Sequence, residues 1–192
     1  IITAVAAFFR LYDLGMAALR ADTILLWGLA ERHVPPGLLF TQWFEVSGAA
    51  GQMPMPAFIM QFFLSLIGWQ LTPFTLRLTF AVFGILTVPV AFFAGRRLGG
   101  PVFGLVFAAL LAVNSFHIAT SREAYFYSTM VFGNFLLFWA SVILVEKLWK
   151  GEALKWQDLA LLALGLFFCG YSQITGMISC GTAGLLAFGL TL

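Results

Sequence analysis

Long apolar runs with almost no charge fill the second half of the chain, and they restrict its fold more than any other feature. A helix needs about 20 apolar residues to cross the hydrocarbon core of a bilayer. Only 9% of the 192 residues are charged, whereas a soluble domain carries about 25%. The runs therefore predict an all-α integral membrane protein, a polytopic bundle of helices. The expected helices lie at about 74–94, 102–118, 125–145, 159–171 and 174–192.

The first 72 residues differ, because only 1–13 read as part of a spanning helix. Residues 14–72 are more polar, and we expect them to form an outer loop of juxtamembrane surface helices. One should run from about Ile24 to Val34, with Asp22 capping its start and Pro35-Pro36-Gly37 ending it. A second amphipathic piece is expected at 38–46. The apolar stretch 57–67 is too short to span and reads as an interfacial or re-entrant helix that Gly68 closes.

Pro73 suits the first turn of the next helix, so the remaining spanning helices are expected within 73–192. The whole chain then forms one transmembrane domain. Its first run is about half a span long, and its last run has no polar exit. We therefore expect a piece of a longer protein.

Four glycines and two cysteines lie inside the apolar runs. Small residues let neighbouring helices approach closely, and we expect this of Gly84, Gly104, Gly133 and Gly165. Cys169 and Cys180 lack metal-ligand spacing and imply no disulfide framework, so they read as small buried residues. The net charge of +2 gives no reason to expect a nucleic-acid partner.

Basic residues predict the orientation, because cytoplasmic loops of membrane proteins carry an excess of lysine and arginine. The stretches around Arg96-Arg97 and 146–158 hold five basic residues against three acidic ones. The opposite side balances five arginines with five acids over a longer length. We place the lysine loops in the cytoplasm and the active face outward, in a bacterial cytoplasmic membrane.

A polar island at 119–128 carries the candidate substrate-binding residues Arg122, Glu123 and Tyr127. An Arg-Glu pair between two apolar runs belongs at an interface or in a polar cavity. Arg122 can bind a lipid phosphate through its guanidinium fork or reach lipid headgroups as an interfacial arginine, and the residues do not decide between these. Glu123 reads as a neighbouring counter-charge.

The upstream partner of this island is Arg20-Ala21-Asp22, in which Asp22 is the candidate catalytic base. The alternative role for Asp22 is a helix cap, and the two roles are compatible. Arg77 is expected to pair with a carboxylate of the outer loop, such as Asp13. The lone histidines His33 and His117 indicate no zinc site.

These residues resemble, in order, motifs of the GT-C superfamily of membrane glycosyltransferases, the proteins similar to protein O-mannosyltransferases and the lipid A aminoarabinose transferase. The resemblance covers about residues 8–130. It rests on Phe9-Arg10-Leu11-Tyr12-Asp13-Leu14-Gly15 followed by Asp22, on Pro56 to Gly68, on Arg77-Leu78 with Gly95 to Gly99, and on Ser121-Arg122-Glu123-Ala124 with Tyr127-Ser128.

The resemblance implies transfer of a sugar from a polyprenyl-phosphate carrier to an acceptor on the outer face of the membrane. It assigns Asp22 to the family's Asp-Glu pair, as catalytic base or in divalent-metal coordination. Thr23 replaces the Glu, Met55 replaces the first proline of a Pro-Pro pair, and Tyr125 replaces a second arginine. The first change weakens the expectation of a metal cofactor.

Two hypotheses of function follow. The first is a glycosyltransferase that uses membrane lipid as sugar carrier. The alternative is a non-catalytic membrane subunit, a shortened or degenerate relative that packs within a larger membrane complex and has partner subunits. A small transporter fits less well, because transporters place charges near the membrane midplane and here they cluster at helix ends.

Overall fold

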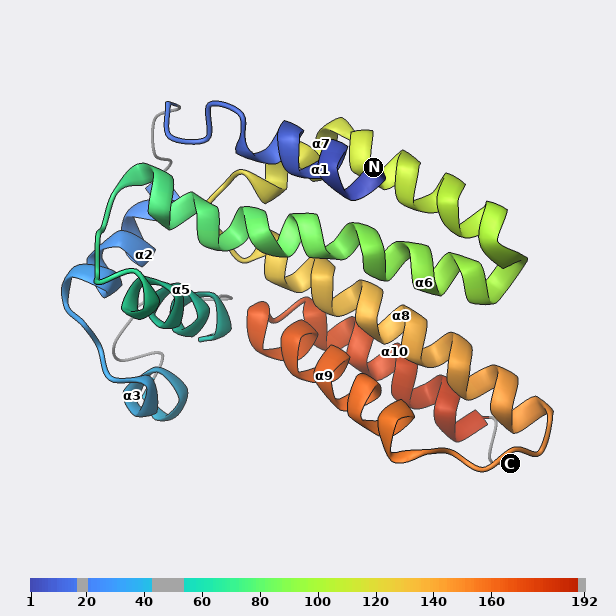
Figure 1. The fold of residues 1–192 in the computed structure, drawn as a ribbon. Helices are drawn as coiled ribbons and strands as arrows, with labels where there is room; N and C mark the ends of the chain where they lie inside the picture. The colour runs from blue at the N-terminus through green and yellow to red at the C-terminus, as the bar shows by residue number, and fades with distance from the viewer. Residues whose placement is uncertain (17–20, 43–53, 190–192) are drawn as a thin grey trace.

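In the computed structural model, which describes residues 1–16, 21–42 and 54–189, the chain is helical (Figure 1). The predicted all-α fold is thus confirmed for this part of the chain. Two helices, α6 with 41 residues and α8 with 23, are long and apolar enough to cross a membrane. The helices are α1 (Ile2–Leu11), α2 (Ala21–Glu31), α3 (Pro36–Thr41), α5 (Met55–Leu66), α6 (Pro73–Val113), α7 (Ser115–Ser121), α8 (Tyr127–Trp149), α9 (Trp156–Ser172) and α10 (Gly176–Gly189).

The long element α6 is a helical hairpin. Non-helical backbone at Gly99 and Gly100 divides it into two arms, and Gly100 has φ 82° and ψ −178°, a conformation open essentially only to glycine. The first arm, 73–98, is about 39 Å long at 1.5 Å per residue. Figure 1 shows the second arm turning back at this corner. The expectation that Arg96 and Arg97 lie in a loop is therefore wrong, because both residues lie in the helix before the corner.

The second arm ends earlier than the expected helix 102–118. Asn114 takes an extended backbone conformation with ψ 116°, and its side-chain oxygen accepts a hydrogen bond from the His117 backbone N–H at 2.8 Å. Asparagine is a favoured N-cap for this reason. The chain consequently stops α6 at Val113 and restarts as α7.

The surface helices gather at the end of α6 opposite the corner (Figure 1). One apolar cluster joins α2, α3 and α5 to the start of α6 and to the turn after α7, so these segments form one packed unit. Its buried members are Leu26, Leu29, Ala30, Val34, Leu39, Ala57, Met60, Leu64, Leu76, Phe80 and Ala124.

Two expected details of the surface helices are wrong. Helix α2 begins at Ala21, so Asp22 lies in its first turn rather than at the capping position. Pro36 lies in the first turn of α3 and starts a helix instead of only ending one, a position where the missing N–H of proline costs nothing. Residues 43–46 of the second expected piece lie outside the described residues, as do Arg20 and Glu45.

The close helix contacts expected at the glycines are confirmed. A Cβ added at Gly133 would lie 2.6 Å from the Cys169 backbone nitrogen, and one at Gly165 would lie 2.7 Å from that of Leu137. These two contacts bring α8 and α9 together backbone to backbone. Cys169 is buried and free, as expected, whereas Cys180 is partly exposed.

Ion pairs connect the corner of α6 to the second basic stretch, residues 146–158, at the same end of the molecule. Arg97 contacts Glu146 of α8 at 2.6 Å, and Lys150 contacts the second oxygen of that carboxylate at 2.7 Å. Lys147 contacts Asp158 of α9 at 2.5 Å. The two polar stretches that the sequence assigns to one face thus meet in the structure.

We expect Gly104→Ala to destabilise the protein by roughly 2 kcal/mol, in the range of overpacking substitutions. The new Cβ would lie 2.6 Å from the Phe92 carbonyl oxygen and 2.8 Å from the Arg96 nitrogen, so both arms must shift. Gly181→Ala, also in a helix but with open space around it, is the control and should be neutral or slightly stabilising. Thermal unfolding in detergent followed by circular dichroism tests this, and equal midpoints would contradict it.

Asp158→Asn should make the stability of the protein less dependent on pH in the acid range. Hydrogen bonds from the Lys147 ammonium and the Lys155 backbone N–H lower the pKa of Asp158. Its stabilising effect is therefore full above about pH 4, the unfolded value, and is lost as the pH falls through the lower folded pKa. The variant should be less stable than the parent at neutral pH, and the difference should vanish in acid. Glu152→Gln, the same charge change in the same loop, should keep the parental pH profile.

Candidate functional site

Two arginines bind backbone carbonyls near the carboxyl end of α1, one carbonyl in the helix itself and one in the turn that follows it. Arg122 follows α7, and its Nη1 donates to the Phe9 carbonyl oxygen at 3.2 Å. Arg77 lies in the second turn of α6, and its Nη1 donates to the Leu14 carbonyl oxygen at 3.0 Å. The end of a helix leaves carbonyl groups without intrahelical partners, so it attracts cations. The backbone of α1 thereby places both guanidinium groups at the same end of the molecule.

These arginines form a small charged cluster with Glu123. Arg122 and Glu123 both lie close enough to Arg77 to interact with its charge. The three groups carry two positive charges and one negative charge, so the cluster retains a net positive charge. Arg122 and Glu123 are half-buried, which leaves part of each in reach of a ligand. A partly exposed guanidinium in such a cluster is suited to binding an anion.

The other predicted site residues belong to neighbouring elements. Tyr127 begins α8, and its half-buried ring packs 4.4 Å from that of Phe126, centroid to centroid. Asp22 lies in the first turn of α2, but its side chain is outside the part that the structure describes. The structure brings the α2 helix and the Arg122 turn together, because Leu26 and Leu29 share a core with Ala124.

Arg10 is the most unusual charged residue of the described chain, and the sequence motifs did not single it out. Its side chain is fully buried. Nη1 donates to the carbonyl oxygens of Ala6 at 3.0 Å and Ala112 at 3.1 Å, and Nη2 donates to that of Leu111 at 3.3 Å. Nη2 also lies 2.7 Å from Nδ1 of His117, which must accept this bond because guanidinium is only a donor.

Arg10 thus completes the end of the second α6 arm. The break at Asn114 leaves the Ala112 carbonyl without a helical partner and the Leu111 carbonyl with only a 3.4 Å bond from the Asn114 N–H, and Arg10 binds both carbonyls from α1. His117 is 93% buried beside it, since only 7% of its surface is exposed. A single arginine near the end of an otherwise apolar helix was the available sequence signal.

Gly84 makes room for this arrangement on the first α6 arm. A Cβ at this position would lie 2.3 Å from Cβ of Ser121 and 3.3 Å from Nε of Arg10. Nε has no hydrogen-bond partner, although it is buried. The end of α7, and with it Arg122, therefore sits directly against α6.

The residues present do not fit a divalent metal. Mg²⁺ and Ca²⁺ take oxygen ligands and usually include carboxylates. Thr23, the residue after Asp22, offers a hydroxyl instead of a second carboxylate, and it is buried. Within the described chain, no three His, Cys, Asp or Glu side chains are grouped closely enough to hold a metal ion.

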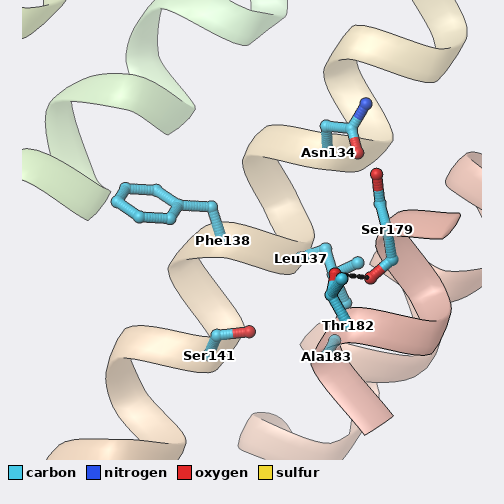
Figure 2. Close-up of a pocket in the computed structure, with 7 residues that line it drawn as sticks. All are labelled: Asn134, Leu137, Phe138, Ser141, Ser179, Thr182 and Ala183. Atoms are coloured by element: carbon cyan, nitrogen blue, oxygen red, sulfur yellow. Dashed lines mark hydrogen bonds between the residues drawn. The ribbon is translucent and has the colours of Figure 1, made fainter. Parts of the chain in front are cut away.

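A separate polar groove of about 240 Å³ lies between α8 and α10 (Figure 2). Asn134 and Ser141 face it from α8, and Ser179 and Thr182 face it from α10. Thr182 donates its hydroxyl hydrogen to the Ser179 carbonyl oxygen at 2.8 Å. None of the lining residues is charged, so this groove offers no group for acid–base catalysis and is distinct from the arginine cluster.

Comparison of the chain with protein-family models, curated proteins and solved structures found no significant match.

Arg10→Met should lower the free energy of unfolding by roughly 2–3 kcal/mol, because the buried Ala112 carbonyl would lose its partner and the Leu111 carbonyl would keep only the long bond from the Asn114 N–H. Arg32→Met is the matched control. Arg32 is exposed and makes one local bond, from Nε to the Gly28 carbonyl oxygen at 3.1 Å, so its loss should cost less than about 0.5 kcal/mol. Denaturant unfolding in detergent measures both. Equal losses would show that Arg10 does not stabilise the junction.

Proposed function

We propose that this chain is the amino-terminal portion of a GT-C-type glycosyltransferase, which moves a sugar from a polyprenyl-phosphate carrier to an acceptor hydroxyl. The observation that carries the proposal is the arginine cluster at the end of α1. One N–H group of Arg122 donates to the Phe9 carbonyl oxygen, and its remaining N–H groups have no partner among the described residues. Such a group is suited to a phosphate, which accepts two parallel N–H bonds.

The position of α2 supports the same reading. This helix carries Asp22, and its Leu26 and Leu29 belong to the same apolar cluster as Ala124, two residues after Arg122. The motif order described above assigns Asp22 to the catalytic acid of the first outer loop. A base and a phosphate-binding group on adjoining segments are what transfer from a phosphate-linked donor requires.

In the proposed reaction, Asp22 removes the proton of the acceptor hydroxyl. The resulting oxygen nucleophile attacks the anomeric carbon of the sugar while the bond between that carbon and the phosphate oxygen breaks. This displacement inverts the configuration at the anomeric carbon. Arg122 binds the polyprenyl phosphate as it leaves, and Arg77 adds positive charge nearby. Glu123 balances part of that charge and keeps the guanidinium groups in place.

The proposal also places the chain in the membrane. The first α6 arm and α8 cross it, and the end bearing Lys147 and Lys150 faces the cytoplasm. The arginine cluster, α2, α3 and α5 then lie at the outer face. Support comes from the length and apolar character of α6 and α8 and from the separation of charged groups into two ends.

A non-catalytic subunit is the second candidate, and one observation favours it. The position after Asp22 holds a buried threonine rather than a second acid. In that case the arginine cluster would stabilise the fold or hold a lipid phosphate without sugar transfer. The full-length protein would then copurify with other membrane chains in fixed stoichiometry.

Transfer of labelled sugar by the full-length protein, from polyprenyl phosphate to acceptors in membranes, tests the first candidate. Asp22→Asn should lower turnover at least 100-fold, as expected for loss of a general base. Arg122→Gln should weaken binding of a short polyprenyl phosphate roughly 10-fold or more, because a hydrogen bond between charged groups is lost.

Arg32→Gln is the control for both variants, since it removes an exposed positive charge just after α2 whose printed bond is to the Gly28 carbonyl oxygen. It should leave turnover and polyprenyl-phosphate affinity at the parental values. Parental turnover in Asp22→Asn would exclude Asp22 as the base. Binding without turnover in every protein, parent included, would favour the subunit.

A further inference from the structure

A cavity lined by two arginines lies at the opposite end of the molecule from the arginine cluster. It has a volume of about 310 Å³ and is formed between the first α6 arm and α8. Phe93, Arg96 and Arg97 line it from α6, and Trp139 and Ile143 line it from α8. Nothing in the proposed sugar transfer uses this cavity.

The two arginines that line the cavity differ in their bonding partners. Arg97 donates from Nε to the Glu146 carboxylate at 2.6 Å, and that carboxylate also accepts from Lys150. Arg96 is exposed and has neither a hydrogen bond nor an ion pair with any described residue. Four cations at this end, Arg96, Arg97, Lys147 and Lys150, are balanced by three acids, Glu146, Glu152 and Asp158, so a net charge of +1 remains near the mouth of the cavity. Arg96 is free to bind an anion there.

The rest of the wall is apolar. The rings of Phe93 and Trp139 stack with centroids 5.5 Å apart and planes 15° apart. Ile143 lies one helical turn further along α8 toward Glu146. A cation beside a flat aromatic wall matches a molecule with an anionic head and a hydrocarbon body. Tryptophan is enriched where membrane helices meet the headgroup layer.

We propose that this cavity binds the phosphate headgroup of an anionic phospholipid, with Arg96 contacting the phosphate and the Phe93–Trp139 wall contacting the upper acyl chains. This inference rests on the membrane placement proposed above, but not on sugar transfer. The lysine end faces the leaflet in which anionic lipids attract basic segments, and basic pockets between helices bind such headgroups. The bound lipid would bridge the α6 corner and α8.

Native mass spectrometry of the full-length protein in detergent tests the proposal, with phosphatidylglycerol and phosphatidylcholine of identical chains in competition. The parent should retain phosphatidylglycerol preferentially. Arg96→Gln should reduce that preference about fivefold, the effect of one arginine near a membrane surface. It leaves the Arg97–Glu146 pair in place, so folding should be preserved. Trp139→Leu should weaken retention of both lipids and keep the preference.

The control is Arg32→Gln, which removes one exposed charge elsewhere and should retain the parental preference. Equal loss in Arg96→Gln and Arg32→Gln would show a general charge effect and overturn the proposal. So would displacement of the lipid by millimolar inorganic phosphate, because the cavity would then recognise a free anion. The Asp22 and Arg122 variants should bind phosphatidylglycerol as the parent does, which separates this result from the sugar-transfer test.

Discussion

The buried guanidinium of Arg10 is the contact on which the rest of the arrangement depends. It joins three segments that are distant in sequence: the end of α1, the last carbonyls of α6 and the imidazole of His117 on α7. No carboxylate is among its hydrogen-bond partners, so the charge is stabilised by backbone dipoles instead of an ion pair. Burying a charge this way is costly unless the donors are well matched, which makes the geometry of this junction tightly constrained.

The position of Arg122 follows from that junction. Ser121 packs against Gly84, and Arg122 then reaches back to the Phe9 carbonyl oxygen. The helix end that Arg10 secures therefore also orients the proposed phosphate-binding group. If α7 continued straight from α6, as the apolar run alone suggested, Arg122 would lie farther from α1.

Charge is divided between the two ends of the helical body, and each end uses it differently. At the α1 end, Arg77 and Arg122 bind backbone carbonyls, and Arg122 keeps N–H donors without a partner among the described residues. At the α6 corner, Arg97, Lys147 and Lys150 are matched by Glu146 and Asp158, and Arg96 remains unmatched. The proposed phosphate of the sugar carrier and the proposed lipid phosphate would thus bind at opposite ends.

Local chemistry was readable from the sequence. Apolar runs predicted the helices, Pro73 predicted the start of α6, and the four small residues within helices predicted backbone contacts, because each of these depends on neighbours along the chain or on side-chain size. The burial of Arg10 was not readable, since its carbonyl and imidazole partners at Leu111, Ala112 and His117 lie about a hundred residues away along the chain. Likewise, the Arg77 side chain reaches the Leu14 carbonyl oxygen only because the chain leaving α1 passes beside the start of α6. No local sequence pattern encodes that packing. The sequence by itself determined an all-helical, apolar chain with polar turns. Only tertiary packing decided which carbonyls, cations and aromatic rings came within hydrogen-bond or van der Waals distance of one another.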